Sequence, residues 1–348
     1  MAAPPARPGP GAPAIQWYPG HIAKAERALT ANLEKVDLVI EVRDARIPLA
    51  TGHPRLRRWI GARPHLLVLN RRDMVPAAAR QDWDRWFRAQ GQLPWWCDAR
   101  AGTGVQQLQQ AAIRAGEALN ARRAGRGMKP RPVRALVLGF PNVGKSALIN
   151  RLVRQKVVAS ARRAGVTRSL RWVRLGQELD LLDAPGVLPP RLDDQRAALH
   201  LAICDDIGQA AYDGEAVALA FVQLLAGLEP VAAAGVPPGL LQRRYGVALQ
   251  RLEPLEAGVP GAPGGAAWFG SALDPAAAAQ TFAAGAAAAR TALPADAAGW
   301  LAAAASRHTS GDTARMAQRL LDDFRRGQLG ALALELPPPA SVPAPPGR

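Results

Sequence analysis

The stretch GFPNVGKS, residues 139–146, decides the fold of this chain. It fits the pattern G-x-x-x-x-G-K-[ST], directly after the apolar run 135–138 and directly before the helix-forming residues 147–153. Its glycines let backbone N–H groups wrap phosphate groups at a helix N-terminus, and its lysine neutralises phosphate oxygens. A chance glycine-rich turn would lack these flanks. We therefore predict a phosphate site formed by Pro141, Asn142, Val143, Gly144, Lys145, Ser146 and Ala147.

Two later segments supply candidate magnesium ligands. The sequence DAPG, residues 183–186, ends another apolar run, where the Asp183 carboxylate can hold magnesium through water and the Gly186 N–H can sense a γ-phosphate. Before it, GVTR at residues 165–168 offers the Thr167 hydroxyl in a mobile loop. Each segment alone is weak evidence, but their order and spacing behind the phosphate loop are informative. The predicted Mg²⁺ site consists of Ser146, Thr167 and Asp183.

A base-recognition motif follows the apolar run 65–69. The sequence NRRD, residues 70–73, places an asparagine beside guanine O6 and N7, and a carboxylate that accepts from N1 and the exocyclic amine. It resembles the N-K-x-D motif of translation-factor-type GTPases. Arg71 replaces the lysine, and an arginine stem can still lie over a purine ring. We therefore predict that Asn70, Arg71 and Asp73 bind a guanine base.

A second loop is predicted to complete the base site. The sequence DARAGTG, residues 98–104, looks like a degenerate form of the Ser-Ala-Lys segment of the same GTPases. It would bring the Ala99 backbone N–H near O6 of the base. Asp98, Ala99 and Arg100 are therefore added to the predicted nucleotide site.

Apolar runs of strand length recur along the first half of the chain. They lie at residues 36–42, 65–70, 133–139, 170–175 and 179–183. Helical stretches separate them, including 77–90 and 105–124. Buried strands alternating with helices are typical of a parallel sheet covered on both faces. After about residue 191 the chain is rich in Ala and Leu with helical spacing, which indicates helices without strands.

The predicted base motifs precede the phosphate loop, whereas the usual GTPase order is the reverse, which indicates a circular permutation. Two further motifs are informative, namely WYPGHIAKA at residues 17–25 and DARIP at residues 44–48. They look like the opening motifs of the YlqF family of ribosome biogenesis GTPases. LLQRRYG at 240–246 and DFRRGQLG at 323–330 are similar to the helical domain of that family. The resemblance covers about residues 17–336 and is weakest over the Ala-rich segment 258–305.

Together these patterns predict an α/β fold: a P-loop GTPase domain with a mostly parallel sheet in circularly permuted order, followed by an all-α C-terminal domain. We expect the GTPase domain at residues 14–190 and a helical domain that binds the ribosome or RNA at 191–336. The Pro-rich ends, 1–13 and 337–348, have few large apolar side chains and are expected to be disordered tails.

The group that activates hydrolysis is not the usual one. Many GTPases place a glutamine after the D-x-P-G segment to orient the attacking water, but here the next residue is Val187. The resemblance implicates His21 of the opening motif as the catalytic residue, and a K⁺ ion held partly by Asn142. A structural histidine beside Trp17 is the alternative for His21. For Asp44 and Arg46 we expect an internal ion pair rather than a part in catalysis.

The charge of the chain indicates a polyanionic partner. Its 348 residues carry a formal net charge of +16, mostly from Arg, which binds phosphate bidentately. Basic residues concentrate at 122–134 and 151–174, which predicts RNA phosphate contacts close to the phosphate loop. No aromatic stacking motif is visible, so shape and charge should dominate RNA recognition. A GC-rich genome is the alternative source of the Arg bias.

The length of the apolar runs and the number of cysteines limit the cellular location and the class of protein that can be expected. No apolar run approaches the roughly 20 residues needed to span a bilayer, and two cysteines allow neither a Cys-rich zinc site nor a disulfide framework. We expect a cytoplasmic, monomeric protein without a membrane partner. Its expected function is to bind GTP and GDP and hydrolyse GTP during maturation of the large (50S) ribosomal subunit, in contact with rRNA. The alternatives are a nucleotide-gated RNA-binding scaffold with negligible hydrolysis and a small-subunit permuted GTPase.

Overall fold

The computed structural model describes residues 15, 32–153, 171–183, 192, 194–250 and 296–338. These residues divide into two compact units. The first unit comprises the described residues of Met1–Asp73 and Leu93–Asp213. The second comprises those of Met74–Gln92 and Gly214–Arg348. Each unit is described separately below.

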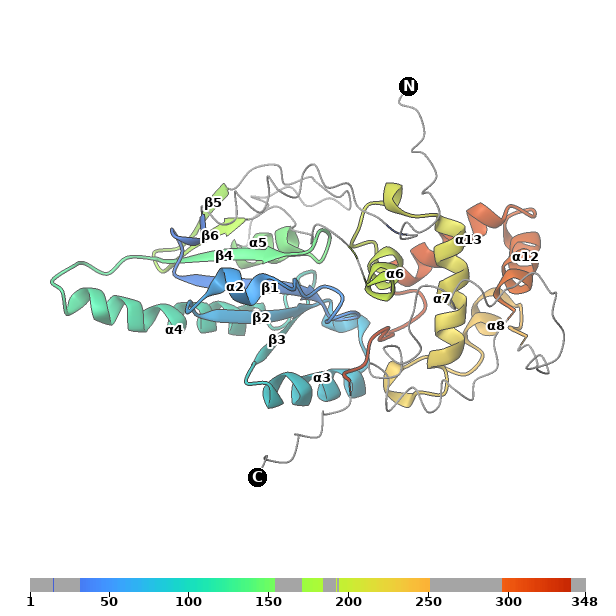
Figure 1. The fold of residues 1–348 in the computed structure, drawn as a ribbon, viewed down its shortest axis with the longest axis horizontal. Helices are drawn as coiled ribbons and strands as arrows, with labels where there is room; N and C mark the ends of the chain where they lie inside the picture. Colours follow the sequence, from blue (N-terminus) through green and yellow to red (C-terminus); the bar gives the residue numbers. More distant parts are fainter. Residues whose placement is uncertain are drawn as a thin grey trace, which may run out of the picture. The chain divides into compact units, whose positions relative to one another are not determined.

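The first unit is built on a six-stranded sheet with the strand order β3-β2-β1-β4-β6-β5 (Figure 1). All neighbouring strands are parallel except β5 and β6, which confirms the prediction of a mostly parallel sheet. The strands are β1 (Leu38–Asp44), β2 (His65–Asn70), β3 (Pro94–Cys97), β4 (Val133–Gly139), β5 (Arg171–Leu175) and β6 (Leu179–Asp183). The helices of this unit are α2 (Leu56–Ile60), α4 (Val105–Ala124), α5 (Lys145–Val153) and α6 (Gln195–Cys204), with the short 3-10 turns η2 (Arg72–Met74), at the unit boundary, and η3 (Gln209–Ala211).

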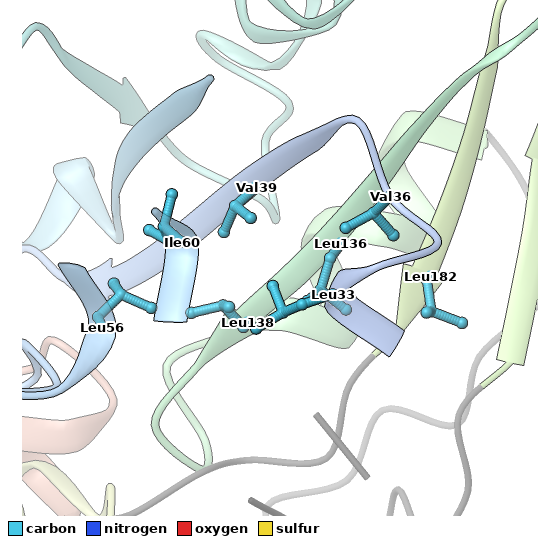
Figure 2. Packing of buried hydrophobic residues seen from close by; sticks show 8 residues of the cluster. All are labelled: Leu33, Val36, Val39, Leu56, Ile60, Leu136, Leu138 and Leu182. Atoms are coloured by element: carbon cyan, nitrogen blue, oxygen red, sulfur yellow. The ribbon is translucent and has the colours of Figure 1, made fainter. Parts of the chain in front are cut away.

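A row of apolar side chains crosses three strands and holds one face of the sheet. Val39 of β1 and Leu182 of β6 both pair in register with Leu136 of β4. The side chains of Leu56 and Ile60 in α2 pack on this row, as Figure 2 shows. Since a five-residue helix is unstable alone, this burial is what stabilises α2.

The other face of the sheet is covered by α4. Successive side chains of a strand point to opposite faces, so Val133 faces away from Leu136. A Cβ added to Gly116 of α4 would overlap Cγ2 of Val133. The helix therefore approaches the sheet as closely as it does because position 116 has no side chain.

Gly116→Ala is expected to lower the free energy of unfolding by about 1–3 kcal/mol through this overlap. Helix propensity alone would favour alanine by about 1 kcal/mol. Gly227→Ala is the matched control, since a Cβ at Gly227 in α7 (Gly214–Leu228) meets nothing within 4 Å; it should stabilise by about 0.5–1 kcal/mol. Urea unfolding of both variants measures the effect, and stabilisation by both would contradict the close packing of α4.

The described part of the second unit consists of helices and 3-10 turns. Phe221 of α7 and Phe324 of α13 are in contact in its core, with ring centroids 4.9 Å apart and the rings tilted by 52°, and α12 packs against both helices. The helices are α3 (Ala77–Ala89), α7 (Gly214–Leu228), α8 (Leu240–Tyr245), α12 (Ala297–His308) and α13 (Thr313–Arg325), with the 3-10 turn η4 (Ala232–Ala234). This agrees with the all-α character expected for the C-terminal half.

Two sequence motifs singled out by the family resemblance meet in the second unit. Arg244 donates from Nη2 to the Asp323 carboxylate at 2.9 Å, and the Tyr245 hydroxyl donates to the same oxygen at 2.9 Å. Arg244 also donates to the Gln328 side chain at 2.7 Å. The motif residues at 240–246 and 323–330 thus tie α8 to the end of α13.

The units divide the chain differently from the expected boundary at residue 190. Helix α3 forms where predicted but belongs to the second unit, because the Trp83 indole donates to the Glu335 carbonyl at 3.2 Å and the Leu332 N–H donates to the Met74 carbonyl at 2.9 Å. Helix α6, expected in the helical domain, belongs to the first unit. Within the described residues, no helix is long and apolar enough to cross a membrane.

Candidate nucleotide-binding site

The phosphate loop lies between the end of β4 and the start of α5, as predicted. Gly139 and Gly144 have φ of +153° and +99°. A Cβ would overlap the Val42 carbonyl at position 139 and the Asn70 amide at position 144. Both glycines are therefore required by the backbone, and the loop passes directly against β1 and the end of β2.

Lys145 is buried at the start of α5, with its ammonium turned into the loop. Its Nζ donates to the Gly139 carbonyl at 3.2 Å and to the Phe140 carbonyl at 2.7 Å. Burial lowers the pKa of Lys145 to about 8, although the nearby carboxylates of Asp183 and Asp206 raise it. The ammonium is thus held beside the loop by neutral carbonyl groups, which a phosphate can replace.

Asp183 ends β6 and has no exposed surface. Neither carboxylate oxygen has a hydrogen-bond partner among the described residues. Burial raises the pKa of Asp183 to about 6, and the charge of Lys145 opposes this rise. Two buried oxygens without donors fit a hard cation such as Mg²⁺, whose ligands are oxygens. Ser146, half-buried in the first turn of α5, offers the hydroxyl predicted for the same ion.

Asn70 joins the base motif to the phosphate loop. Its Nδ2 donates to the Val143 carbonyl at 2.9 Å, and its Oδ1 accepts from the Ala99 N–H at 3.1 Å. One buried amide therefore holds together three segments that are 29 and 73 residues apart. The permuted motifs meet at one end of the sheet.

The loop after β3 is shaped by Asp98. Its Oδ1 accepts from the N–H groups of Arg100 at 2.8 Å and Ala101 at 3.1 Å, which fixes the turn. The Ala99 N–H is thereby presented to Asn70. Asp73, in contrast, is exposed in η2, where a ligand can reach it.

Arg71 makes contacts that the sequence did not indicate. Its φ is +64°, and its guanidinium donates to the Asn142 carbonyl at 2.5 Å and lies 3.0 Å from the Asp44 carboxylate. Instead of reaching only over a purine ring, the side chain connects the base motif to the phosphate loop and to β1. The two-pronged guanidinium makes both contacts at once, which an ammonium point charge does less well.

The expected ion pair between Asp44 and Arg46 is present and fully buried. Arg46 Nη2 lies 2.7 Å from Asp44 Oδ2, and the same nitrogen donates to the Cys204 carbonyl at 3.2 Å. Burial raises the pKa of Asp44, but Arg46 and Arg71 outweigh it and hold that pKa below its usual value. The pair anchors the end of α6 to the end of β1.

Two residues after α6 complete the site and were missed from the sequence. The Asn142 side chain donates to the Asp205 carbonyl at 2.6 Å. Asp206 is fully buried, its carboxylate lacks a hydrogen-bond partner among the described residues, and Arg71 Nη2 lies 3.9 Å away. Burial and the charge of Asp44 raise its pKa well above the usual value. The sequence feature that could have revealed them is the pair of adjacent acidic residues, Asp205 and Asp206, directly after the apolar helix α6.

Three predicted site residues lie outside the described part of the chain. They are His21, Thr167 and Gly186. The predicted residues within it, at 70–73, 98–100, 141–147 and 183, border the ends of β2, β3, β4 and β6. These ends lie at one edge of the sheet, where parallel α/β folds bind ligands.

Asn70→Ala is expected to weaken guanine-nucleotide binding about 5- to 100-fold, since two net hydrogen bonds of about 0.5–1.5 kcal/mol each hold the site together. Binding of a fluorescent GDP analogue measures it. Asn120→Ala is the matched control, because Asn120 also bridges two backbone groups, both of Arg131, away from the site. Equal losses of affinity in the two variants would show that Asn70 has no special part in binding.

Comparisons with known proteins agree with this geometry. Residues 134–218 match the family described as 50S ribosome-binding GTPase. The chain is 39% identical over 188 residues to ribosome biogenesis GTPase A of Bacillus cereus, covering 54% of this chain and 64% of that relative. It is 36% identical over 205 residues to ribosome biogenesis GTPase A of Bacillus pumilus, covering 59% of this chain and 73% of that relative.

A solved structure supports the fold over a longer region. The GDP-bound structure of TM YlqF superimposes with a TM-score of 0.51 at 18% identity and covers 89% of this chain and 98% of that one. At this identity the likeness concerns the fold alone. Together with the sequence relatives, it shows that the chain belongs to the ribosome biogenesis GTPase A (YlqF) family of circularly permuted GTPases.

Proposed function

We propose that this protein binds GTP, docks in that state on an immature large ribosomal subunit, and hydrolyses GTP there as the signal for release. The observation that carries the proposal is the bridge made by Asn70, which draws the base motif, the loop at Ala99 and the phosphate loop into one site. The names of the relatives support the ribosomal part. A cytoplasmic location and a monomeric state belong to the same proposal.

In this proposal, binding of GTP releases Lys145 from the carbonyls of Gly139 and Phe140 so that it contacts phosphate oxygens. Asn70 and Asp73 bind guanine, with the Ala99 N–H beside O6. Ser146, Thr167 and Asp183 hold Mg²⁺, which when bound neutralises charge on the phosphates. The buried carboxylate of Asp183, which has no hydrogen-bond donor within the described part of the chain, supports its part in this set.

We assign the catalytic role to His21, because Val187 cannot orient a water molecule. His21→Ala should keep its affinity for GTP but lose most of the turnover stimulated by ribosomal subunits, by about 10²- to 10⁴-fold if the imidazole acts in general acid–base catalysis. Multiple-turnover phosphate release with purified large subunits measures this. Unchanged stimulated turnover would mean that His21 is a structural residue beside Trp17.

A potassium ion at Asn142 is the second part of the activation proposal. The Asn142 Nδ2 already donates to the Asp205 carbonyl, so the amide oxygen is the atom that would face a cation. Exchanging K⁺ for Na⁺ at constant ionic strength should then slow turnover. Equal rates in the two salts would remove the cation from the mechanism.

The ribosomal part is tested by co-sedimentation with separated subunits and a non-hydrolysable GTP analogue. The proposal expects binding to large subunits with the analogue and weaker binding with GDP. Binding to small subunits alone would instead support the small-subunit GTPase. Nucleotide-dependent binding without stimulated single-turnover hydrolysis would support the scaffold.

A further inference from the structure

An aromatic side chain is exposed on the edge strand β5. Trp172 is 42% exposed, and among the described residues only Leu93 and Met128 are other exposed large apolar side chains. Strand β5 pairs with β6 on one side and ends the sheet on the other (Figure 1). A single exposed apolar side chain is common on protein surfaces, so the charged neighbours of Trp172 decide whether it belongs to a binding surface.

Two arginines flank the ring on the same face of the sheet. Arg134 of β4 and Arg174 of β5 both pair in register with Asp180 of β6, so the three side chains form a row across the strands. Arg174 is two residues from Trp172 and points to the same face. The Arg134 guanidinium lies over the Trp172 ring, 5.8 Å from its centroid. We call Trp172, Arg134 and Arg174 the Trp172 surface.

The acidic groups nearby, Asp180 and the exposed Glu178 of the turn between β5 and β6, offset only part of the charge of this surface. Arg174 is 77% exposed and lies 3.5 Å from Asp180, the acid that it shares with Arg134 in the row. Asp37 is already bound by both Nη atoms of Arg131, at 2.7 and 2.8 Å. The last turn of α4 and its connection into β4 add exposed cations at the same end of the sheet, namely Arg122, Arg126 and Lys129.

The arginines of the Trp172 surface lie toward the end of the sheet away from the nucleotide site, whereas Trp172 pairs with Leu182, next to Asp183. Arg134 is near the start of β4, whereas the phosphate loop follows the end of that strand. This corrects the expectation that the basic residues before the phosphate loop lie close to it, because a strand separates its two ends by about 3.3 Å per residue. An RNA phosphate bound to Arg134 would therefore be separated from the phosphate loop by the length of β4.

We propose that the Trp172 surface binds RNA that carries an unpaired base, with the base stacked on Trp172 and neighbouring phosphates on Arg134 and Arg174. A flat ring beside guanidinium groups suits a nucleobase and its backbone, and stacking tolerates any base. The inference rests on the proposed function, since it names how the ribosomal partner is held. It also adds aromatic stacking to a recognition that the sequence had attributed to shape and charge.

The test uses two fluorescein-labelled RNA hairpins, one with a single bulged adenine and one fully paired, titrated with the full chain. The wild type should prefer the bulged hairpin. Trp172→Leu, which keeps apolar bulk but loses the π face, should bind the bulged hairpin about 5- to 100-fold more weakly and lose the preference. Trp172→Phe should keep part of it. Arg134→Ala and Arg174→Ala should each reduce the salt slope by about 1.

Arg114→Ala is the matched control, since Arg114 is exposed on α4, which covers the opposite face of the sheet. It should change neither the preference nor the salt slope. The proposal is overturned if the wild type binds both hairpins equally, or if Trp172→Leu and Trp172→Phe both bind as the wild type does. It is also overturned if Trp172→Leu instead dissociates a dimer paired through β5.

The two levels of the proposal fail separately. Retained binding of a GTP analogue by each variant shows that the first unit is folded. If the wild type did not co-sediment with ribosomal subunits but still preferred the bulged hairpin, the ribosomal function would be overturned and the RNA-binding role of the Trp172 surface would remain supported. If the wild type co-sedimented with ribosomal subunits but bound both hairpins equally, the RNA-binding role of the Trp172 surface would be overturned and the ribosomal function would remain supported.

Discussion

Arg46→Met should lower the free energy of unfolding by about 3–5 kcal/mol, as expected when one partner of a buried ion pair is removed. Among the described residues, the variant leaves the fully buried Asp44 carboxylate with the backbone N–H of residue 46 and the partly exposed Arg71 guanidinium as its partners. It also leaves the Cys204 carbonyl without the donor that ties α6 to the end of β1. Urea unfolding followed by far-UV circular dichroism measures the loss.

Arg88→Met provides the control for this experiment. Arg88 forms an ion pair with Asp84 on α3, but its side chain is 57% exposed, and such pairs contribute only about 0–1 kcal/mol. A cost below about 1 kcal/mol for Arg46→Met would mean that Asp44 is neutralised by other groups. In that case α6 would not depend on the ion pair for its position.

Lys145→Met should weaken GTP binding by about 10²- to 10⁴-fold. Two hydrogen bonds to charged phosphate oxygens, each of about 1.5–3 kcal/mol, are lost with the ammonium group. Methionine has a similar length and suits the buried position, so the fold should persist. Because the variant no longer buries a charge, the desolvation cost that it avoids should offset part of the stability lost with the hydrogen bonds to the Gly139 and Phe140 carbonyls. Isothermal titration with GTP and Mg²⁺ measures the change.

Lys35→Met is the matched control, because Lys35 is exposed and bonds only weakly to Asn32, at 3.5 Å. It should bind GTP as the wild type does. If Lys145→Met retained affinity within a factor of about 3, the phosphate contacts would have to come from backbone groups and metal alone. The assignment of Lys145 would then be wrong.

The position of α6 changes how the permutation is understood. From sequence, the segment after Asp183 was expected to run directly into the helical domain. The structure instead places α6 in the first unit, where its end contacts Asn142 of the phosphate loop and Arg46 after β1. The phosphate loop is therefore in direct contact with the end of α6 inside the first unit.

Most strands and helices of the first unit were predictable, although β1 lies two residues later than the predicted 36–42 and α2 was not predicted. Runs at 65–70, 133–139 and 179–183 form strands with the predicted bounds, and α4 spans the predicted 105–124. Strand β3 was missed, because its four residues begin with proline and show no alternation. It forms because its backbone pairs in register with β2, from Leu67 with Pro94 to Asn70 with Cys97.

The sequence by itself determined the fold class and the phosphate loop, because both depend on neighbouring residues: apolar runs of strand length, and glycines around Lys145. Only the tertiary structure decided how the site is completed. Arg46 meets Cys204 across 158 residues, and Asn142 meets Asp205 across 63. Such contacts exist because α6 packs beside the phosphate loop, and no local pattern in the sequence encodes that packing.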